Sequence, residues 1–196
     1  MDKTYCIFGD SVTQAAYVKS GWVDLFREYL EVKGADQFVN IFNLGIGGNT
    51  SVDILKRFKV ESEARMPTEI IFAVGVNDSG YFRTLDKPIV SKEIFIENIE
   101  SLIKEAKSFT NNITFIGLTL GDDSLFKPFP ESSQGKSYDL HRVRDYDKTI
   151  EEIATRNQCR FVSLIEALKF EDFFDGLHPN DDGHMKMFNI IKDYFS

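Results

Sequence analysis

Five short apolar runs, spaced along a chain of 196 residues, constrain the fold more than any other feature of the sequence. They lie at 5–8, 38–42, 69–74, 113–118 and 160–165. Each run is apolar on both faces, which is typical of central strands in a parallel sheet. Stretches with helical periodicity separate the runs, at about 20–33, 51–60, 91–109, 141–157 and 181–195. Because strands and helices alternate, the pattern predicts an α/β domain with a five-stranded parallel sheet and right-handed crossovers.

Length and charge narrow the class of the protein and its partners. A chain of this length suits one globular domain, which we expect to span 1–196. The formal net charge of -8 repels phosphate backbones, so nucleic acid is not an expected partner. No apolar run approaches the roughly 20 residues that cross a bilayer, so we expect no integral membrane segment. The sequence does not predict the oligomeric state.

The two cysteines and the N-terminus bear on the cellular compartment. The first residues lack a long apolar region followed by a small-residue cleavage site, so a signal peptide is not expected. Cys6 and Cys159 fall on predicted strands or strand edges. Without a secretion signal, two reduced thiols are favoured over a disulfide. The sequence therefore predicts a cytoplasmic protein.

Polar or glycine-rich segments follow three of the predicted strands and precede the last helix. They are Gly9-Asp10-Ser11, the segment 43–49, the segment 75–78, and the loop 175–179 with the sequence Asp-Gly-Leu-His-Pro. Ligands of parallel α/β sheets bind outside the carboxyl ends of the strands. We therefore expect these four segments to meet at one edge of the sheet.

Three residues of these segments have the chemistry of a nucleophile, its base and the carboxylate that orients the base. The hydroxyl of Ser11 is a weak nucleophile until a base takes its proton. Asp175 and His178 lie in one loop, so the carboxylate can reach one imidazole nitrogen while the other nitrogen faces Ser11. Donors for an oxyanion are expected at the backbone N–H of Ser11, the N–H of Gly48 and the amide of Asn77. Taken alone, a serine after Gly-Asp is more typical of a turn or a helix cap.

Together these residues resemble the sequence blocks of the SGNH, or GDSL-type, esterases and lipases. The matching residues, in family order, are Gly9-Asp10-Ser11, Gly48 within 43–50, Asn77 within 75–78, and Asp175 with His178. The resemblance implies a flavodoxin-like three-layer α/β/α sandwich and hydrolysis of esters or thioesters through an acyl-enzyme. It also implies that the enzyme needs no metal and no cofactor. Because Gly47 stands beside Gly48, the second-block donor has two candidates.

Other interpretations of the same residues stay open. A metal site formed by Asp175, His178 and His184 is disfavoured because the spacing does not suit a structural zinc site. His184 is instead expected to pack or cap locally. The glycines at 45–48 lack the Gly-x-Gly-x-x-Gly spacing of a dinucleotide phosphate loop. A flavodoxin-like module that binds a flavin or another small ligand without turnover remains an alternative from a different class.

Several neighbouring residues have expected supporting roles. Asp10 and Asp78 are expected to hold their turns by hydrogen bonding rather than to react. Segment 121–140 follows the fourth strand and forms either a flap over the pocket or a surface loop without consequence. The candidate pocket residues are Tyr81, Phe82 and Phe126.

The expected substrate is a small-molecule ester. Short acyl esters, lysophospholipids and acetylated sugars all fit a small domain with an open site. Acyl transfer to a sugar or alcohol would use the same residues and is the second enzymatic hypothesis. In either case activity is expected to rise with pH as His178 loses its proton.

Overall fold

The main sheet has five parallel strands. The computed structural model describes residues 2–33, 38–119, 121, 123–125 and 132–195. The strands of the sheet are β1 (Lys3–Gly9), β2 (Val39–Gly45), β3 (Glu69–Ala73), β6 (Ile113–Ile116) and β8 (Arg160–Val162). Their order is β2-β1-β3-β6-β8, and every neighbouring pair is parallel. This confirms the predicted sheet, and the order is that of flavodoxin-like folds.

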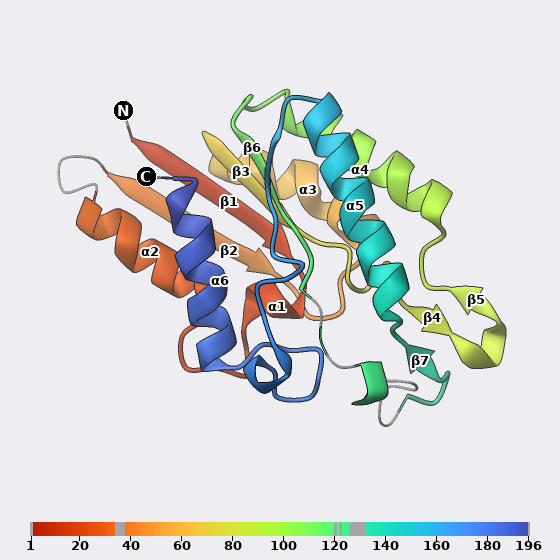
Figure 1. Cartoon of the computed structure of the whole chain (residues 1–196). Coiled ribbons are helices and arrows are strands. Elements are labelled where there is room, and N and C mark those ends of the chain that lie inside the picture. The colour runs from red at the N-terminus through yellow and green to blue at the C-terminus, as the bar shows by residue number, and fades with distance from the viewer. Residues whose placement is uncertain (1, 34–37, 120, 122, 126–131, 196) are drawn as a thin grey trace.

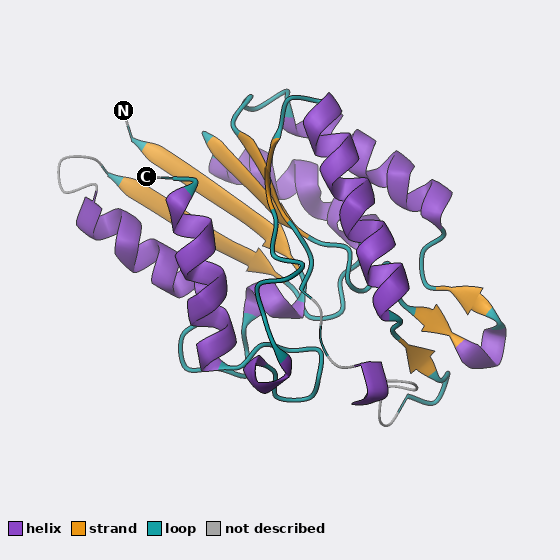
Figure 2. Ribbon diagram, in the orientation of Figure 1, coloured by secondary structure: helices purple, strands orange, loops and turns teal. Residues whose placement is uncertain are grey.

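Five long helices cover the two faces of this sheet within the described part of the chain (Figure 1). Two pack on one face: α2 (Trp22–Lys33) and α6 (Asp181–Asp193). Three pack on the other face: α3 (Ser51–Arg65), α4 (Lys92–Ala106) and α5 (Leu140–Arg156). Figure 2 shows the strands lying between these two groups of helices. The arrangement is the expected three-layer α/β/α sandwich.

Strand β1 shows why its predicted run is apolar throughout. Tyr5 and Ile7 belong to the core shared with α2 and α6, whereas Cys6 and Phe8 belong to the core on the side of α3 and α4. All four side chains are at most 1% exposed. Because successive side chains of a strand point to opposite faces, a strand that is covered on both sides has no solvent-facing position.

Two small elements are not predicted by the sequence pattern. The helix α1 (Ser11–Gln14) is a single turn directly after β1. A second sheet has the order β5-β4-β7 and consists of β4 (Tyr81–Phe82), β5 (Lys87–Pro88) and β7 (Lys136–Ser137). Its neighbouring strands are antiparallel. Strands of two residues are too short to show alternation in a sequence.

The bounds of some elements differ from their predicted positions. Helix α3 continues to Arg65, beyond its predicted end at residue 60. The sequence pattern misses these last turns because they are mostly polar and show little apolar periodicity. The strands β6 and β8 end at Ile116 and Val162, before the ends of their apolar runs. Three short 3₁₀ turns complete the described elements: η1 (Arg83–Leu85), η2 (Asp123–Leu125) and η3 (Phe170–Asp172).

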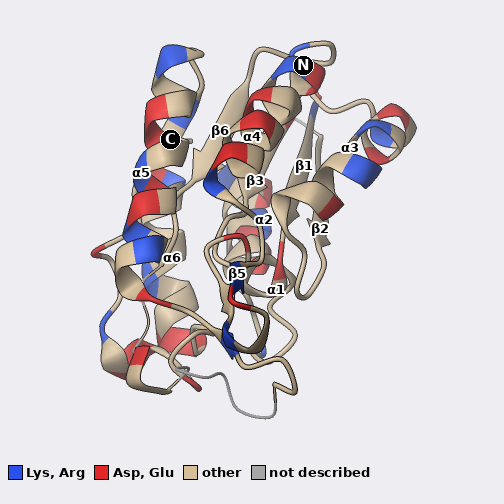
Figure 3. Ribbon diagram, turned by 90° about the vertical axis from the view of Figure 1, so that its right-hand side faces the viewer, with Lys and Arg blue, Asp and Glu red and all other residues tan. Residues whose placement is uncertain are grey.

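Charged residues of both signs are mixed along the outer helices (Figure 3). On α5, Lys148 pairs with Glu152 at 3.8 Å, and Arg144 pairs with Glu166 beyond the helix. Exposed pairs of this kind contribute about 0–1 kcal/mol each, so they matter more for the character of the surface than for stability. Across the described residues, no helix is both long enough and apolar enough to cross a membrane.

Candidate active site

Ser11 and Asn77 follow the two strands at which the winding of the sheet reverses. The chain passes from β1 to β2 through α2 on one face, and from β2 to β3 through α3 on the other. A doubly wound sheet binds its ligands at this switch point, outside the carboxyl ends of the strands. In Figure 1, α1 and the segment before α6 lie at this same end of the sheet.

A continuous chain of hydrogen bonds joins Ser11, His178 and Asp175. The Oγ atom of Ser11 lies 2.9 Å from Nε2 of His178, and Nδ1 of His178 lies 2.7 Å from Oδ2 of Asp175. Oδ1 of Asp175 accepts from the backbone N–H of Leu177 at 2.9 Å and from that of His178 at 2.8 Å. With the ring proton on Nδ1, facing the carboxylate, Nε2 can accept the proton of the serine.

The carboxylate of Asp175 is held in its ionised form. Burial by itself would raise the pKa of Asp175, but hydrogen bonds donated by His178 and Leu177 outweigh burial and lower this pKa below its ordinary value. The side chain of His178 is 14% exposed, whereas that of Asp175 is 42% exposed. The imidazole is therefore sheltered, and a permanent negative charge lies against one of its nitrogens.

Asp10 holds the turn that presents Ser11. Its Oδ1 accepts from the N–H of Val12 at 2.9 Å and caps the single helical turn that begins at Ser11. Asp10 is 2% exposed, and desolvation raises its pKa to about 7. The N–H of Ser11 has no acceptor within this turn, nor elsewhere among the described residues. Asp10 thus has the supporting role expected from the sequence, and Ser11 keeps a free backbone donor.

The structure distinguishes the two candidate glycines of the second loop. The N–H of Gly47 donates to Oε1 of Gln14 at 2.9 Å. In the described part of the chain, the N–H of Gly48 has no acceptor. Gly48 has a φ of 78°, which residues with a Cβ rarely adopt, and a Cβ there would have no atom within 4 Å. Gly48 keeps a free donor in open surroundings, which favours it over Gly47.

The side-chain amide of Asn77 is buried and hydrogen-bonded at both ends. Its Nδ2 donates to the carbonyl oxygen of Asn49 at 3.1 Å. Its Oδ1 accepts from Nζ of Lys136 at 3.0 Å and from the hydroxyl of Tyr138 at 2.9 Å. An amide nitrogen carries two hydrogens, so one N–H remains for an oxyanion. Asn49 directly follows Gly48, so this hydrogen bond brings the predicted donors Gly48 and Asn77 close together.

Asp78 fastens the second loop to the third. Its carboxylate accepts from the N–H of Ser51 at 2.9 and 3.0 Å and from the Ser51 hydroxyl at 2.5 Å. The same hydroxyl accepts from Nδ2 of Asn98 on α4 at 3.0 Å. Asp78 is fully buried, and desolvation raises its pKa to about 6. This carboxylate has the expected supporting role, since it fixes the start of α3 beside the loop of Asn77.

Comparison with known families places this arrangement in context. The model of the GDSL-like lipase/acylhydrolase family matches residues 7–186, a range that includes all the residues described above. The chain belongs to this family. As a GDSL-like protein it is a carboxylic ester hydrolase, and this assignment weighs against the flavin-binding alternative.

Two known proteins are similar in sequence to this GDSL-like chain. The acetylxylan esterase of Geobacillus stearothermophilus is 25% identical over 203 residues, covering 90% of this chain and 86% of that enzyme. The uncharacterised lipoprotein YqeF of Bacillus subtilis (strain 168) is 33% identical over 111 residues, covering 51% of this chain. That alignment spans only 42% of the lipoprotein.

Solved structures share the fold of this GDSL-like chain. The acetylxylan esterase Axe2 of Geobacillus stearothermophilus superposes with a TM-score of 0.78 at 20% identity, covering 97% of this chain and 93% of that one. LAE5, an alpha/beta hydrolase enzyme from the metagenome of Lake Arreo, has a TM-score of 0.78 at 20% identity, covering 97% and 94%. Catalytic mutants of Axe2 at a serine, an aspartate and a histidine are among the similar structures.

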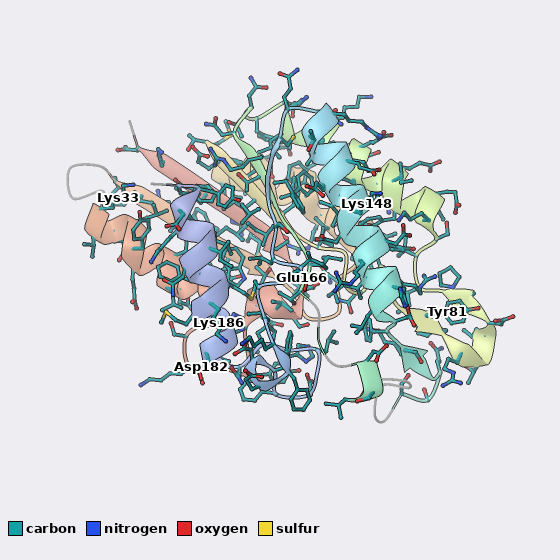
Figure 4. The ribbon with its side chains drawn as sticks, in the orientation of Figure 1. Lys33, Tyr81, Lys148, Glu166, Asp182 and Lys186 are labelled. Atoms are coloured by element: carbon teal, nitrogen blue, oxygen red, sulfur yellow. The ribbon has the colours of Figure 1, made fainter. Side chains whose placement is uncertain are left out.

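The predicted pocket residues of this GDSL-like chain lie on the small sheet or outside the described residues. Tyr81 and Phe82 form β4, and Figure 4 shows Tyr81 at the edge of the molecule. The hydroxyl of Tyr81 donates to Asp86 at 2.6 Å, and the Arg142 guanidinium lies 5.5 Å from its ring centre. Neither contact involves the Ser11–His178 pair, so a pocket role for Tyr81 and Phe82 stays a prediction. Phe126 lies outside the described residues.

His184 packs and caps locally, as the sequence predicts. It is 2% exposed, and its Nδ1 accepts from the N–H of Trp22, the first residue of α2, at 3.3 Å. Burial lowers the pKa of His184 to about 4, so the ring is neutral at neutral pH. This nitrogen is therefore engaged by the helix start rather than turned toward His178 and Asp175.

Three residues at the site were beyond the reach of sequence reasoning. The ring of Tyr17 lies 5.0 Å from the ring of His178 and is 66% exposed. Lys136 and Tyr138 reach Asn77 from β7 and the residue after it. None belongs to a recognised sequence block. The sequence gives one indication of a role for Lys136 and Tyr138. Both lie in segment 121–140, for which a flap over the pocket is one of the two predictions.

Proposed function

We propose that this chain is a serine esterase that hydrolyses short acyl esters through an acyl-enzyme on Ser11. The observation that carries the proposal is the hydrogen-bonded chain from Ser11 through His178 to Asp175, with separations of 2.9 and 2.7 Å. A hydroxyl, an imidazole and a carboxylate in this order are the groups that acyl transfer to serine requires. Membership of the GDSL-like family agrees with this chemistry.

In the first step, Nε2 of His178 takes the proton of Ser11 while Oγ forms a bond to the carbonyl carbon of the ester. The N–H groups of Ser11 and Gly48 and the free N–H of Asn77 hold the negative oxygen. The intermediate collapses when the bond to the alcohol oxygen breaks, and His178 returns its proton to that oxygen. Asp175 stabilises the imidazolium that exists between these two events. The alcohol leaves, and the acyl group stays on Ser11.

In the second step, water takes the place of the alcohol. His178 removes a proton from the water as its oxygen bonds to the acyl carbon, and the same donors hold the new oxyanion. The bond to Oγ of Ser11 then breaks, and His178 returns the proton to Oγ. A carboxylic acid leaves, and the enzyme is restored to its starting state.

Acetyl esters of sugars are the favoured substrates within the class. The acetylxylan esterase of Geobacillus stearothermophilus matches 90% of this chain at 25% identity. Tyr17 adds an exposed aromatic ring beside His178, and such a ring offers an apolar face with a polar tip to a sugar. Lysophospholipids and longer acyl esters are the alternatives that the acyl-chain series below separates.

A fluorophosphonate probe tests the proposed nucleophile, because it phosphonylates only an activated serine. We expect one label per chain in the natural protein and none in Ser11→Ala. Ser108→Ala is the matched control, since Ser108 is exposed and its hydroxyl donates to the carbonyl oxygen of Glu105. A folded natural protein that takes no label, or an S11A variant that is labelled equally, would contradict the proposal.

An ester series tests the substrate class with the same preparations. We expect rates to fall from p-nitrophenyl acetate to butyrate to octanoate, and acetylated xylo-oligosaccharide to release acetate faster than lysophosphatidylcholine releases fatty acid. Parallel reactions with an acceptor alcohol measure acyl transfer against hydrolysis. Faster cleavage of the long acyl chains would overturn the short-acyl assignment while leaving the nucleophile intact.

The cytoplasm is the compartment that we propose for this esterase. Cys6 and Cys159 are both free thiols, which is the usual state in a reducing compartment.

A further inference from the structure

The amide of Asn77 is held by two side chains that no step of the proposed mechanism uses. Nζ of Lys136 and the hydroxyl of Tyr138 donate to its Oδ1 at 3.0 and 2.9 Å. These two bonds occupy the oxygen and fix which end of the amide is which. Nδ2 must then face the opposite way, where one N–H meets the carbonyl oxygen of Asn49 and the other is free.

Both side chains come from the small sheet rather than from the main one. Lys136 lies on β7 and pairs with Phe82 of β4, while Tyr138 follows β7 directly. Tyr138 is 1% exposed, and its ring packs in the core on the side of α4 and α5. The ammonium of Lys136 lies 5.1 Å from the centre of the Tyr138 ring. Lys136 and Tyr138 thus contact each other, and both contact Asn77 from the small sheet or the residue that follows it.

The surroundings of Lys136 are poor in water and include the carboxyl group of Asp10. Burial lowers the pKa of Lys136, and the carboxylate of Asp10 opposes that effect. Asp10 in turn lies directly before Ser11 and is itself fully buried. A cation in such surroundings interacts with its hydrogen-bond partner more strongly than it would in water.

We propose that Lys136 and Tyr138 are positioning residues for the oxyanion donor Asn77. Their hydrogen bonds keep the free N–H of the amide directed at the carbonyl oxygen of the substrate, and the ammonium polarises the amide so that this N–H donates more strongly. This inference rests on the proposed function, in which Asn77 holds the oxyanion.

Without these two partners, the orientation of the Asn77 amide is less firmly set. An Asn77 amide without these partners can rotate so that Oδ1 and Nδ2 exchange places. Oδ1 would then lie against the developing negative charge of the substrate. The hydrogen bond to Asn49 also opposes this rotation, because Oδ1 would then face the carbonyl oxygen of Asn49. Two donors on Oδ1, one of them charged, make the reversed amide unfavourable. Their effect belongs to the transition state, where the oxyanion exists, and not to substrate binding.

The test compares Lys136→Met, Tyr138→Phe and Asn77→Ala on p-nitrophenyl acetate. Loss of an oxyanion donor typically lowers kcat by about 100- to 1000-fold, which is the expectation for N77A. K136M, which keeps the length of the side chain and loses its charge, is expected to lower kcat about tenfold or more with KM nearly unchanged. Y138F is expected to lower kcat less than K136M does. Lys136→Arg, which restores a cation, is expected to recover part of the loss.

The decisive measurement is the pair of double variants with Asn77→Ala. If Lys136 and Tyr138 act through Asn77, neither K136M nor Y138F lowers kcat further once the amide is gone. An equal loss in the presence and absence of Asn77 would overturn the proposal. The affinity of a boronic acid, which mimics the tetrahedral intermediate, is expected to fall in parallel with kcat across the single variants.

Two controls separate this inference from other causes. Lys87→Met removes a lysine from β5 of the same small sheet, where the side chain is exposed, and is expected to keep the natural kcat. Thermal unfolding shows whether K136M folds; if it does not, Y138F carries the same test, since it loses only a hydroxyl. A natural protein that the fluorophosphonate does not label refutes the proposed function itself. A labelled protein in which K136M and Y138F retain the natural kcat refutes only the positioning role.

Discussion

At the scale of single residues, Gly47 and Gly48 show how neighbouring positions of one loop are used differently. Gly47 donates its N–H to Gln14 and thereby ties the loop to the turn that carries Ser11. Gly48 has a φ of 78° and leaves its N–H without an acceptor among the described residues. The sequence leaves both glycines as candidates, and only the backbone geometry distinguishes an N–H that is hydrogen-bonded within the protein from one that is free.

Alanine at each of these glycines tests that distinction. A left-handed residue with a Cβ costs roughly 1–2 kcal/mol, so Gly48→Ala is expected to lower the free energy of unfolding by that amount. G48A is also expected to lower kcat, because the backbone can relieve the strain by rotating, and this rotation would turn the N–H of residue 48 away from the oxyanion. Gly47→Ala places a Cβ 3.0 Å from Oε1 of Gln14, a movable side-chain end, so a smaller loss is expected. Urea unfolding and kcat of both variants check this. A larger loss of kcat in G47A than in G48A would assign the oxyanion donor to Gly47.

At the scale of elements, α2 and α6 meet through a histidine that stays uncharged. Nδ1 of His184 on α6 accepts from the N–H of Trp22, one of the donors at a helix start that have no partner within their own helix. Trp22 is completely buried, as Val23 and Phe26 of the same helix are. The hydrogen bond therefore lies where an unsatisfied donor would be costly.

This contact makes stability depend on pH in a defined direction. Burial lowers the pKa of His184 to about 4, whereas an unfolded histidine takes a proton near pH 6.5. The stabilisation is complete above pH 6.5 and is lost as pH falls toward 4, by roughly 3 kcal/mol. Desolvation raises the pKa of Asp10 to about 7, and that change acts in the opposite direction. The natural protein must therefore be compared with a variant at His184 itself.

His184→Gln is the variant to compare, since its amide oxygen can still accept from Trp22 but does not titrate. Urea unfolding at pH 7 and pH 4.5 gives the free-energy difference between the two proteins at each pH. Asp24, Asp181 and His178 are the titratable groups that act on His184, and all three are retained in H184Q. We expect the advantage of the natural protein to shrink at the lower pH. An advantage that stays constant or grows would refute a depressed pKa for His184.

At the scale of the whole molecule, the parts that the sequence predicts are those with a local signature. The central strands β1, β3 and β6 are largely apolar because helices cover both faces, whereas the edge strands β2 and β8 keep partly exposed positions. The approach of Ser11 to His178 followed from one rule, that strand ends of a parallel sheet share an edge. The two-residue strands and α1 have too few residues to produce a pattern.

Contacts between distant segments account for the rest of what the sequence did not predict. Lys136 and Tyr138 lie 59 and 61 residues from Asn77, and their pairing depends on how the small sheet sits against the main one. No local periodicity encodes that placement. Tyr17 is similar, because its neighbour His178 comes from the far end of the chain. The division into a single domain over 1–196 stays a prediction.

Cys6 provides a probe of the whole molecule. It lies within β1, is completely buried, and has a pKa raised to about 12 by desolvation. In a Cys159→Ser background, a disulfide reagent is therefore expected to modify Cys6 only as fast as the protein unfolds. The reaction is expected to be complete at once in concentrated urea. Rapid modification in native buffer would show that the central sheet opens locally.

The contact between Ser11 and His178 joins residues 167 positions apart in the sequence. Within this sequence Ser11 is translated just after β1, whereas His178 follows all five strands of the main sheet. A nascent chain that has not yet reached residue 178 therefore lacks the base that we propose for Ser11.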